Sequence, residues 1–150
     1  MSILEGSTTM PSTSNQVNAV TDFLTKSQVQ YLATIGLDDK PKVRPFQFML
    51  EDGGRLYFCT SNQKPVLKEL QKHPYVEFCA SGENFSWLRL NGKVVFSQDL
   101  GLKARIQDAS PLVKSIYKTP DNPAFEIFYL DGAVATIADF SGNPPRTFQL

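Results

Sequence analysis

Arg44 is a cation inside the run KVRPFQFML (residues 42–50), which otherwise has the composition of a β-strand. Side chains along a strand alternate between two faces. The face of Arg44 also holds Phe46, Phe48 and Leu50, and the opposite face holds Val43, Pro45, Gln47 and Met49. One face therefore carries a cation among aromatic side chains. The alternative is a strand-end arginine whose stem covers apolar surface while its charged head reaches water.

A second polar group is the motif TSNQKP, which begins at Thr60 and leads from a predicted strand into a predicted helix. The hydroxyls of Thr60 and Ser61, the free N–H groups of a helix start and the ammonium of Lys64 are the donors of an anion site. Lys68 follows one turn later, on the same side of the helix. The alternative is an ordinary helix cap, made by Ser61 or Asn62, next to a solvated lysine face.

The third group is WLRL, in which strand alternation places Trp87 and Arg89 on one face and the two leucines on the other. An arginine in this position could stack on the indole ring or pair with an acid. It could equally lie over a surface tryptophan and cover the sheet. If the fold brings the three groups together, their side chains can donate hydrogen bonds to one phosphate-sized anion from several sides. These donors are Arg44, Thr60, Ser61, Lys64 and Arg89.

Other kinds of site have little support in the sequence. With 15 basic and 15 acidic residues the chain has no net charge, which argues against a nucleic-acid field. Cys59 and Cys79 lie in apolar strand-like runs, where a reduced thiol acts as a small hydrophobe. The only histidine, His73, lies at a predicted helix end, so we expect no metal site. We see neither a signal peptide nor a membrane span and expect a cytoplasmic protein.

The pattern of apolar residues predicts one α+β domain, mainly β, at residues 15–150, after a loose Ser/Thr-rich tail at residues 1–14. Helices are predicted at 15–27, 65–73 and 100–110, with a further turn of helix at 112–117. Strands are predicted at 31–36, 42–54, 55–61, 75–82 and 85–99, and residues 143–150 could form an edge strand. FEIFYL, Asp131-Gly132 and AVATIADF predict a hairpin. Closure into an antiparallel barrel would remove the exposed strand edges.

Several segments together resemble the FMN-binding split-barrel proteins related to pyridoxamine 5′-phosphate oxidase, in particular their nitroimidazole-resistance-like branch. The segments are VRPF, LYFCTSNQKPVLKELQKHPYVEF, WLRLNGKV, PLVKSIY and the closing TFQL. Each is weak alone, but their order and spacing are specific from about Val17 to Leu150. The resemblance implies a six-stranded antiparallel split β-barrel with short flanking helices. It also implies a homodimer with two FMN sites at the subunit interface.

The resemblance also implies roles for individual residues. Arg44 is similar to the family arginine that approaches the FMN phosphate, and the backbone of Pro45, Phe46 and Gln47 would border the isoalloxazine. The other implied cofactor-binding residues are Thr60, Ser61 and Lys64 at the phosphate, Lys68 as an addition, and Trp87 and Arg89 near the flavin edge from the neighbouring subunit.

The chain departs from its relatives in two places. The Arg-x-His with which the oxidase binds its substrate is missing, because Arg146 is followed by Thr147 and Phe148. No histidine lies near Arg44, where the nitroimidazole-reducing members have one. We therefore expect an FMN-dependent oxidoreductase with an unknown substrate. The alternatives are a flavin store or sensor without catalysis, a haem or deazaflavin binder, and a small barrel that stacks single-stranded nucleic acid.

Overall fold

The computed structural model describes residues 13–150, so most of the predicted N-terminal tail lies outside the described residues. A single antiparallel sheet of eight strands dominates the fold. The strands are β1 (Gln30–Ile35), β2 (Pro41–Phe46), β3 (Leu50–Asp52), β4 (Arg55–Ser61), β5 (Tyr75–Ser81), β6 (Trp87–Ser97), β7 (Phe125–Ala138) and β8 (Arg146–Gln149). The helices are α2 (Thr13–Ser27), α3 (Pro65–Lys72), the 3-10 turn η1 (Glu83–Phe85), α4 (Leu100–Ala109) and α5 (Pro111–Tyr117).

The strand order β2-β1-β5-β6-β7-β4-β3 gives a strongly curved sheet whose two ends face each other. Its two end strands, β2 and β3, are consecutive in sequence and separated only by residues 47–49. This link is tied to both ends of the sheet: the Phe48 N–H donates to Gln30 Oε1 at 2.7 Å, and the Met49 N–H donates to the Tyr57 carbonyl at 3.0 Å. The sheet does not close fully, and the predicted split-barrel class is confirmed.

Of two strand predictions, one differs from the structure and one is confirmed. The predicted strand at 42–54 is divided into β2 and β3, because the chain bends where it crosses between the two ends of the sheet. The predicted edge strand near the C-terminus is confirmed as β8, which pairs with β7. The sheet has eight strands, two more than the six that the resemblance implies.

The predicted hairpin at Asp131-Gly132 is wrong, since FEIFYLDGAVATIA forms the continuous strand β7. Both halves of β7 pair with β6 and not with each other, and the register shifts between Asn91 and Lys93. Gly132 has a φ of 61°, in the left-handed region. A positive φ at a register shift is typical of a β-bulge, so the Asp-Gly pair bends a long strand here.

Aromatic rings fill the interior of the barrel. Phe58 stacks on Phe78, with ring centroids 4.1 Å apart and planes 14° apart. Phe46 meets Phe78 edge-on at 6.0 Å, whereas Val43 on the opposite face of β2 is 67% exposed. The alternation predicted for this strand is therefore confirmed, and Arg44 lies on the inward-facing side with Phe46.

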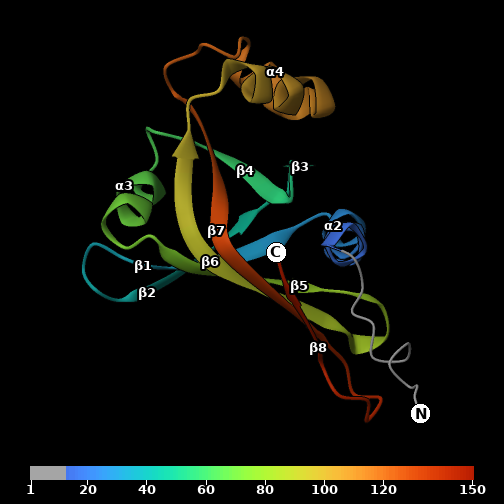
Figure 1. Cartoon of the computed structure of the whole chain (residues 1–150). Helices are drawn as coiled ribbons and strands as arrows, with labels where there is room; N and C mark the ends of the chain where they lie inside the picture. Colours follow the sequence, from blue (N-terminus) through green and yellow to red (C-terminus); the bar gives the residue numbers. More distant parts are fainter. Residues whose placement is uncertain (1–12) are drawn as a thin grey trace.

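The helices lie around the rim of the barrel (Figure 1). In α3 the buried side chains Val66 and Leu70 hold the helix against the sheet, as its spacing predicts. Helices α4 and α5 form a second apolar cluster with β4 and β7 through Tyr57, Ile106 and Phe125. Within residues 13–150, no helix is both long and apolar enough to cross a membrane.

Candidate functional site

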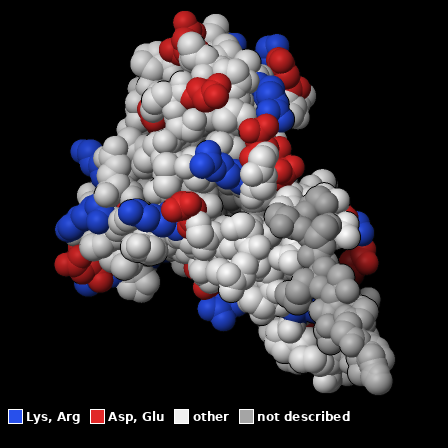
Figure 2. Space-filling model, viewed as in Figure 1, with Lys and Arg blue, Asp and Glu red and all other residues white. Residues whose placement is uncertain are grey.

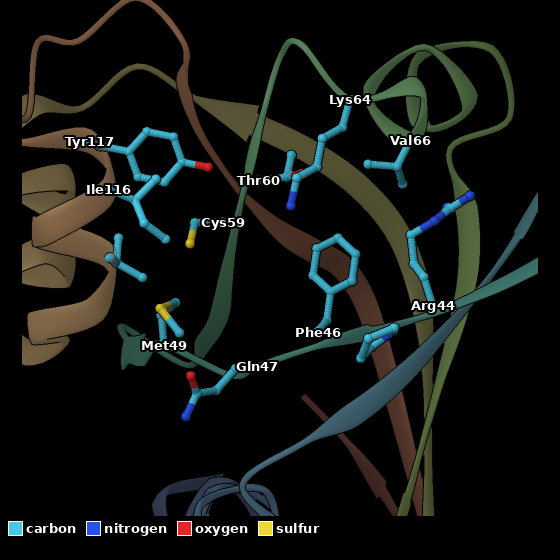
Figure 3. A pocket seen from close by; sticks show the side chains of 12 residues that line it. Arg44, Phe46, Gln47, Met49, Cys59, Thr60, Lys64, Val66, Ile116 and Tyr117 are labelled. Carbon is cyan, nitrogen blue, oxygen red and sulfur yellow. The ribbon is translucent and has the colours of Figure 1, made fainter.

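A pocket of about 320 Å³ opens between β2, the end of β4, the start of α3 and helix α5 (Figure 3). Its walls come from segments that are far apart in the sequence. The lining residues are Arg44, Pro45, Phe46, Gln47, Met49, Cys59, Thr60, Lys64, Val66, Val113, Ile116 and Tyr117. The first two predicted polar groups, around Arg44 and Lys64, thus meet at one place.

The guanidinium of Arg44 is held by two side chains from other elements. Its Nη1 donates to Glu69 Oε1 at 2.9 Å and to Thr34 Oγ1 at 3.1 Å. Burial opposes ionisation of the Glu69 carboxyl, but the hydrogen bonds from Arg44 and Thr34 outweigh it and lower the pKa of Glu69. Arg44 is therefore more than a solvated strand-end cation: it forms an ion pair with a buried carboxylate beside the pocket.

Lys64 lies directly before α3, as its N-cap residue, and no side chain caps the helix there. Neither predicted cap, Ser61 or Asn62, serves α3. The Ser61 hydroxyl accepts from the Gln63 N–H at 3.2 Å, and the Asn62 amide donates to the Pro123 carbonyl at 2.6 Å. Pro65 has no N–H and the Leu67 N–H donates to the Lys64 carbonyl at 3.2 Å, so the first turn leaves the Val66 N–H without a side-chain acceptor. The nearby Lys64 ammonium points toward Thr60 in Figure 3.

The thiol of Cys59 and the phenol of Tyr117 also border the pocket. Burial raises the pKa of Cys59 to about 12, although the Lys64 ammonium acts in the opposite direction. Burial also raises the pKa of Tyr117, and a hydrogen bond with Ser61 offsets part of this effect. Both groups are protonated at neutral pH, so neither supplies a nucleophile or a base.

The remaining predicted site residues lie outside this pocket. Ser61 and Lys68 are not among the residues that line it. Trp87 and Arg89 share a face of β6, as predicted, but this face is the outside of the barrel. There Trp87 packs on Phe140 with ring centroids 5.2 Å apart, and Arg89 forms two hydrogen bonds with Glu77, the shorter 2.7 Å long. Arg89 thus does not join the donors of the pocket within one chain.

Sequence reasoning missed two parts of the site. Glu69 is 25 residues from Arg44, and in the run LKELQK it resembles an ordinary solvated helix residue. The wall formed by Val113, Ile116 and Tyr117 was also not predicted. These three positions have the i, i+3, i+4 spacing of one helix face, which is the signal that could have revealed them.

A second hollow, of about 550 Å³, lies between the end of α2, η1 and the end of β7. It carries Lys26 and Arg146 but also Glu83 and Asp139, so its charges select for neither anions nor cations. Among residues 13–150, no three His, Cys, Asp or Glu side chains gather closely enough to hold a metal ion. The pocket at Arg44 and Lys64 is therefore the candidate site with a defined chemical preference.

Comparisons with known proteins show the family of the chain. The family model for pyridoxamine 5′-phosphate oxidase matches residues 17–136, while none of the curated proteins matches. The crystal structure of a NimC/NimA family protein from Clostridium acetobutylicum has a TM-score of 0.81 and 31% identity, covering 89% of this chain and 93% of that one.

More distant structures share the fold. A pyridoxamine 5′-phosphate oxidase-related, FMN-binding protein from Nostoc punctiforme has a TM-score of 0.66 at 20% identity, with 87% of each chain covered. A heme-binding protein from Mycobacterium smegmatis also has a TM-score of 0.66, at 16% identity, covering 94% of this chain and 59% of that one. Because the family model spans most of the described barrel, and a NimC/NimA family protein is 31% identical over most of both chains, the chain belongs to the pyridoxamine 5′-phosphate oxidase family.

Proposed function

We propose that the pocket binds FMN and that the protein is an FMN-dependent oxidoreductase. The observation that carries this proposal is the division of the pocket into a polar end and an apolar wall. Lys64, Thr60 and Arg44 supply cations and a hydroxyl for a phosphate monoester, which carries close to two negative charges. Phe46, Met49 and the face of α5 supply the apolar surface that a flavin ring requires.

The donors at the polar end fit a phosphate. Within the described residues Lys64 has no carboxylate at ion-pair distance, and the start of α3 lacks a side-chain cap. An anion at this position would pair with the Lys64 ammonium and would also accept a hydrogen bond from the uncapped start of α3. Arg44 is partly neutralised by Glu69, so the two cations and one carboxylate leave a net positive charge of about one for the incoming phosphate.

Bound FMN would supply the redox chemistry, because flavins transfer hydride or single electrons while the protein provides binding and orientation. In this chain Lys64, Thr60 and Arg44 would hold the phosphate, and Pro45, Phe46 and Gln47 would border the ring. The Cys59 thiol and Tyr117 phenol, both protonated, could donate hydrogen bonds but not accept a proton. We assign no catalytic residue.

Haem is the second candidate ligand, because two structural neighbours are heme proteins, one described as heme-binding and one as a heme storage protein. The polar end of the pocket favours FMN, since Lys64 and Thr60 are suited to a phosphate. The single histidine of the chain, His73, follows the end of α3 and does not line the pocket. A flavin store without catalysis would use the same residues and would differ in its lack of turnover with an electron donor.

A homodimer is also part of the proposal. The outer face of β1, β2 and β5 exposes Tyr31, Val43 and Tyr75. Tyr31 lies opposite Cys79, and Cys79 opposite Arg89, so Arg89 and these apolar side chains share one face. A second copy packed on this face would bury it and could bring Trp87 and Arg89 to the partner's flavin. A cytoplasmic location also stays a prediction.

The test compares FMN with riboflavin, which lacks the phosphate. We expect Arg44→Ala and Lys64→Ala together to raise the Kd for FMN by at least about tenfold, because a hydrogen bond to a charged group contributes roughly 1.5–3 kcal/mol. The Kd for riboflavin, measured by the same fluorescence titration, should change by less than about twofold. Lys72→Ala removes a lysine from the far end of α3 and is the matched control.

An unchanged Kd for FMN in the double variant would refute the assignment of these two residues to the phosphate. An equal loss of FMN and riboflavin affinity would show that the pocket had been damaged as a whole.

The charged face in Figure 2 mixes basic and acidic side chains, so we expect no salt-dependent binding of oligonucleotides.

A further inference from the structure

Three polar side chains from three different elements form a closed network behind the polar end of the pocket. The Thr34 hydroxyl on β1 donates to Glu69 Oε1 at 2.7 Å, and Arg44 Nη1 on β2 donates to both Glu69 Oε1 and Thr34 Oγ1. Glu69 comes from α3, and its side chain is only 6% exposed. Burying even a paired carboxylate costs desolvation free energy that the pairing does not always repay, so the presence of Glu69 here calls for a reason.

The way in which Arg44 is held suggests that reason. A guanidinium has five N–H donors and often grips a carboxylate with two parallel hydrogen bonds, as Arg89 grips Glu77 on the outside of the barrel. In Arg44 both hydrogen bonds to described residues leave from the single nitrogen Nη1. One corner of the group is fixed, and Nε and Nη2 are left for another acceptor.

The network also fixes α3 relative to the strands. Glu69 lies in the same short helix that begins after Lys64, whose ammonium points into the pocket. A link from Glu69 to β1 and β2 therefore sets the distance between the two cations of the pocket, Arg44 and Lys64. A rigid spacing of two cations reduces the entropy lost when an anion is bound between them.

We propose that Glu69 is a positioning residue that gives the pocket its preference for a phosphorylated flavin over an unphosphorylated one. The proposal rests on the proposed binding of FMN. Glu69 acts through Arg44 and through the placement of α3, and it does not touch the ligand itself. Thr34 completes the network by donating to the same carboxylate oxygen.

A purely structural role would have a different signature. If Glu69 only stabilised α3, its loss would weaken every ligand of the pocket to the same extent. If it positions the phosphate-binding cations, its loss affects FMN and spares riboflavin. The ratio of the Kd for riboflavin to the Kd for FMN separates these two roles and does not depend on catalytic activity.

The experiment measures this ratio by fluorescence titration of the full chain and its variants. In Glu69→Ala we expect the ratio to fall by about tenfold, through a weaker FMN complex, because the released Arg44 guanidinium must be ordered again when FMN binds. This loss outweighs the gain from removing the Glu69 charge, which partly neutralises Arg44. Glu69→Gln retains an oxygen acceptor for Nη1 and should recover part of the ratio. Thr34→Val, which is nearly isosteric, should lower the ratio less than Glu69→Ala does. It replaces Glu69→Ala as the test if the Glu69→Ala protein does not fold.

Asp52→Ala is the matched control, because it breaks the Arg105–Asp52 pair, 2.7 Å long, whose residues do not line the pocket. A ratio that stays at the wild-type value in Glu69→Ala and Thr34→Val, or equal losses for both flavins, would overturn the positioning role while leaving FMN binding intact. A wild-type protein that binds neither flavin would instead overturn the proposed function on which this inference rests.

Discussion

The carboxylate of Glu69 is ionised although it is almost completely buried. Burial alone would raise its pKa, but the hydrogen bonds donated by Arg44 and Thr34 hold that pKa below the usual value, with a further contribution from the Lys42 ammonium. A group with a lowered pKa in the folded state stabilises that state only where it is ionised. Protonation of Glu69 therefore links the stability of the barrel to pH.

The sign of this effect gives a prediction. Above about pH 4.5, the usual pKa of a glutamate, Glu69 contributes fully to stability. As the pH falls below this value and through the lowered pKa of the folded protein, the contribution is lost. We expect the free energy of unfolding of wild type to exceed that of Glu69→Gln at pH 7, and the difference to shrink as the pH falls below 4.5. Urea unfolding at both pH values measures it; a difference independent of pH would contradict this assignment.

Sequence reasoning identified residues by chemical type better than it identified their partners. Arg44, Thr60 and Lys64 could be chosen as candidates because alternation along a strand and the start of a helix are local patterns. They meet at one pocket because of the fold. Glu69 could not be linked to Arg44 in this way, since the contact depends on how α3 docks on the sheet. Arg89 shows the same limit: its face was predicted correctly, but its pairing with Glu77 follows from strand register.

Strand β7 is the element in which local sequence and tertiary structure disagree most. Asp-Gly is a strong hairpin signal because glycine accepts a positive φ, and Gly132 does adopt one. The strand continues nevertheless, because β6 pairs with β7 on both sides of the bulge. Lys93 pairs with Asp131 before it, and Asn91 pairs with Val134 after it. Gly92 on β6 leaves room for this bulge, since a Cβ there would lie 3.0 Å from the Asp131 carbonyl oxygen.

The bulge can be tested by substitution. We expect Gly132→Ala to lower the free energy of unfolding by about 1 kcal/mol, because a Cβ disfavours the left-handed backbone at this residue. Gly132→Asn should cost less, since asparagine tolerates that conformation better than alanine. Space is not the cause, because nothing lies within 4 Å of a Cβ built on Gly132. Urea unfolding of both variants decides, and equal stability of wild type and Gly132→Ala would exclude backbone strain.

The helices follow their sequence patterns more closely. Residues 65–73 were predicted as a helix from Pro65 in the first turn and the spacing of Val66 and Leu70, and α3 spans Pro65–Lys72. The division of residues 42–54 into two strands was not predicted, because the bend at 47–49 is imposed by the meeting of the two ends of the sheet. Local patterns thus predict helices well and leave barrel geometry open.

At the scale of the whole molecule, the curvature of the sheet creates the site. Residues 44–49 from one end of the sheet, the end of β4 and the helices α3 and α5 surround the pocket. The outer face of β1, β2 and β5 remains exposed and apolar in a single chain. We therefore expect both a flavin in the pocket and a second copy of the chain on this face.

Sedimentation velocity of the purified protein, incubated with FMN and desalted, tests both requirements in one measurement. Recording protein absorbance and visible flavin absorbance together gives the mass of the particle and its flavin content. We expect one boundary at the mass of a dimer, carrying about one FMN per chain. A colourless boundary, or a boundary that carries the spectrum of haem in place of flavin, would contradict the central claim that this pocket is an FMN site.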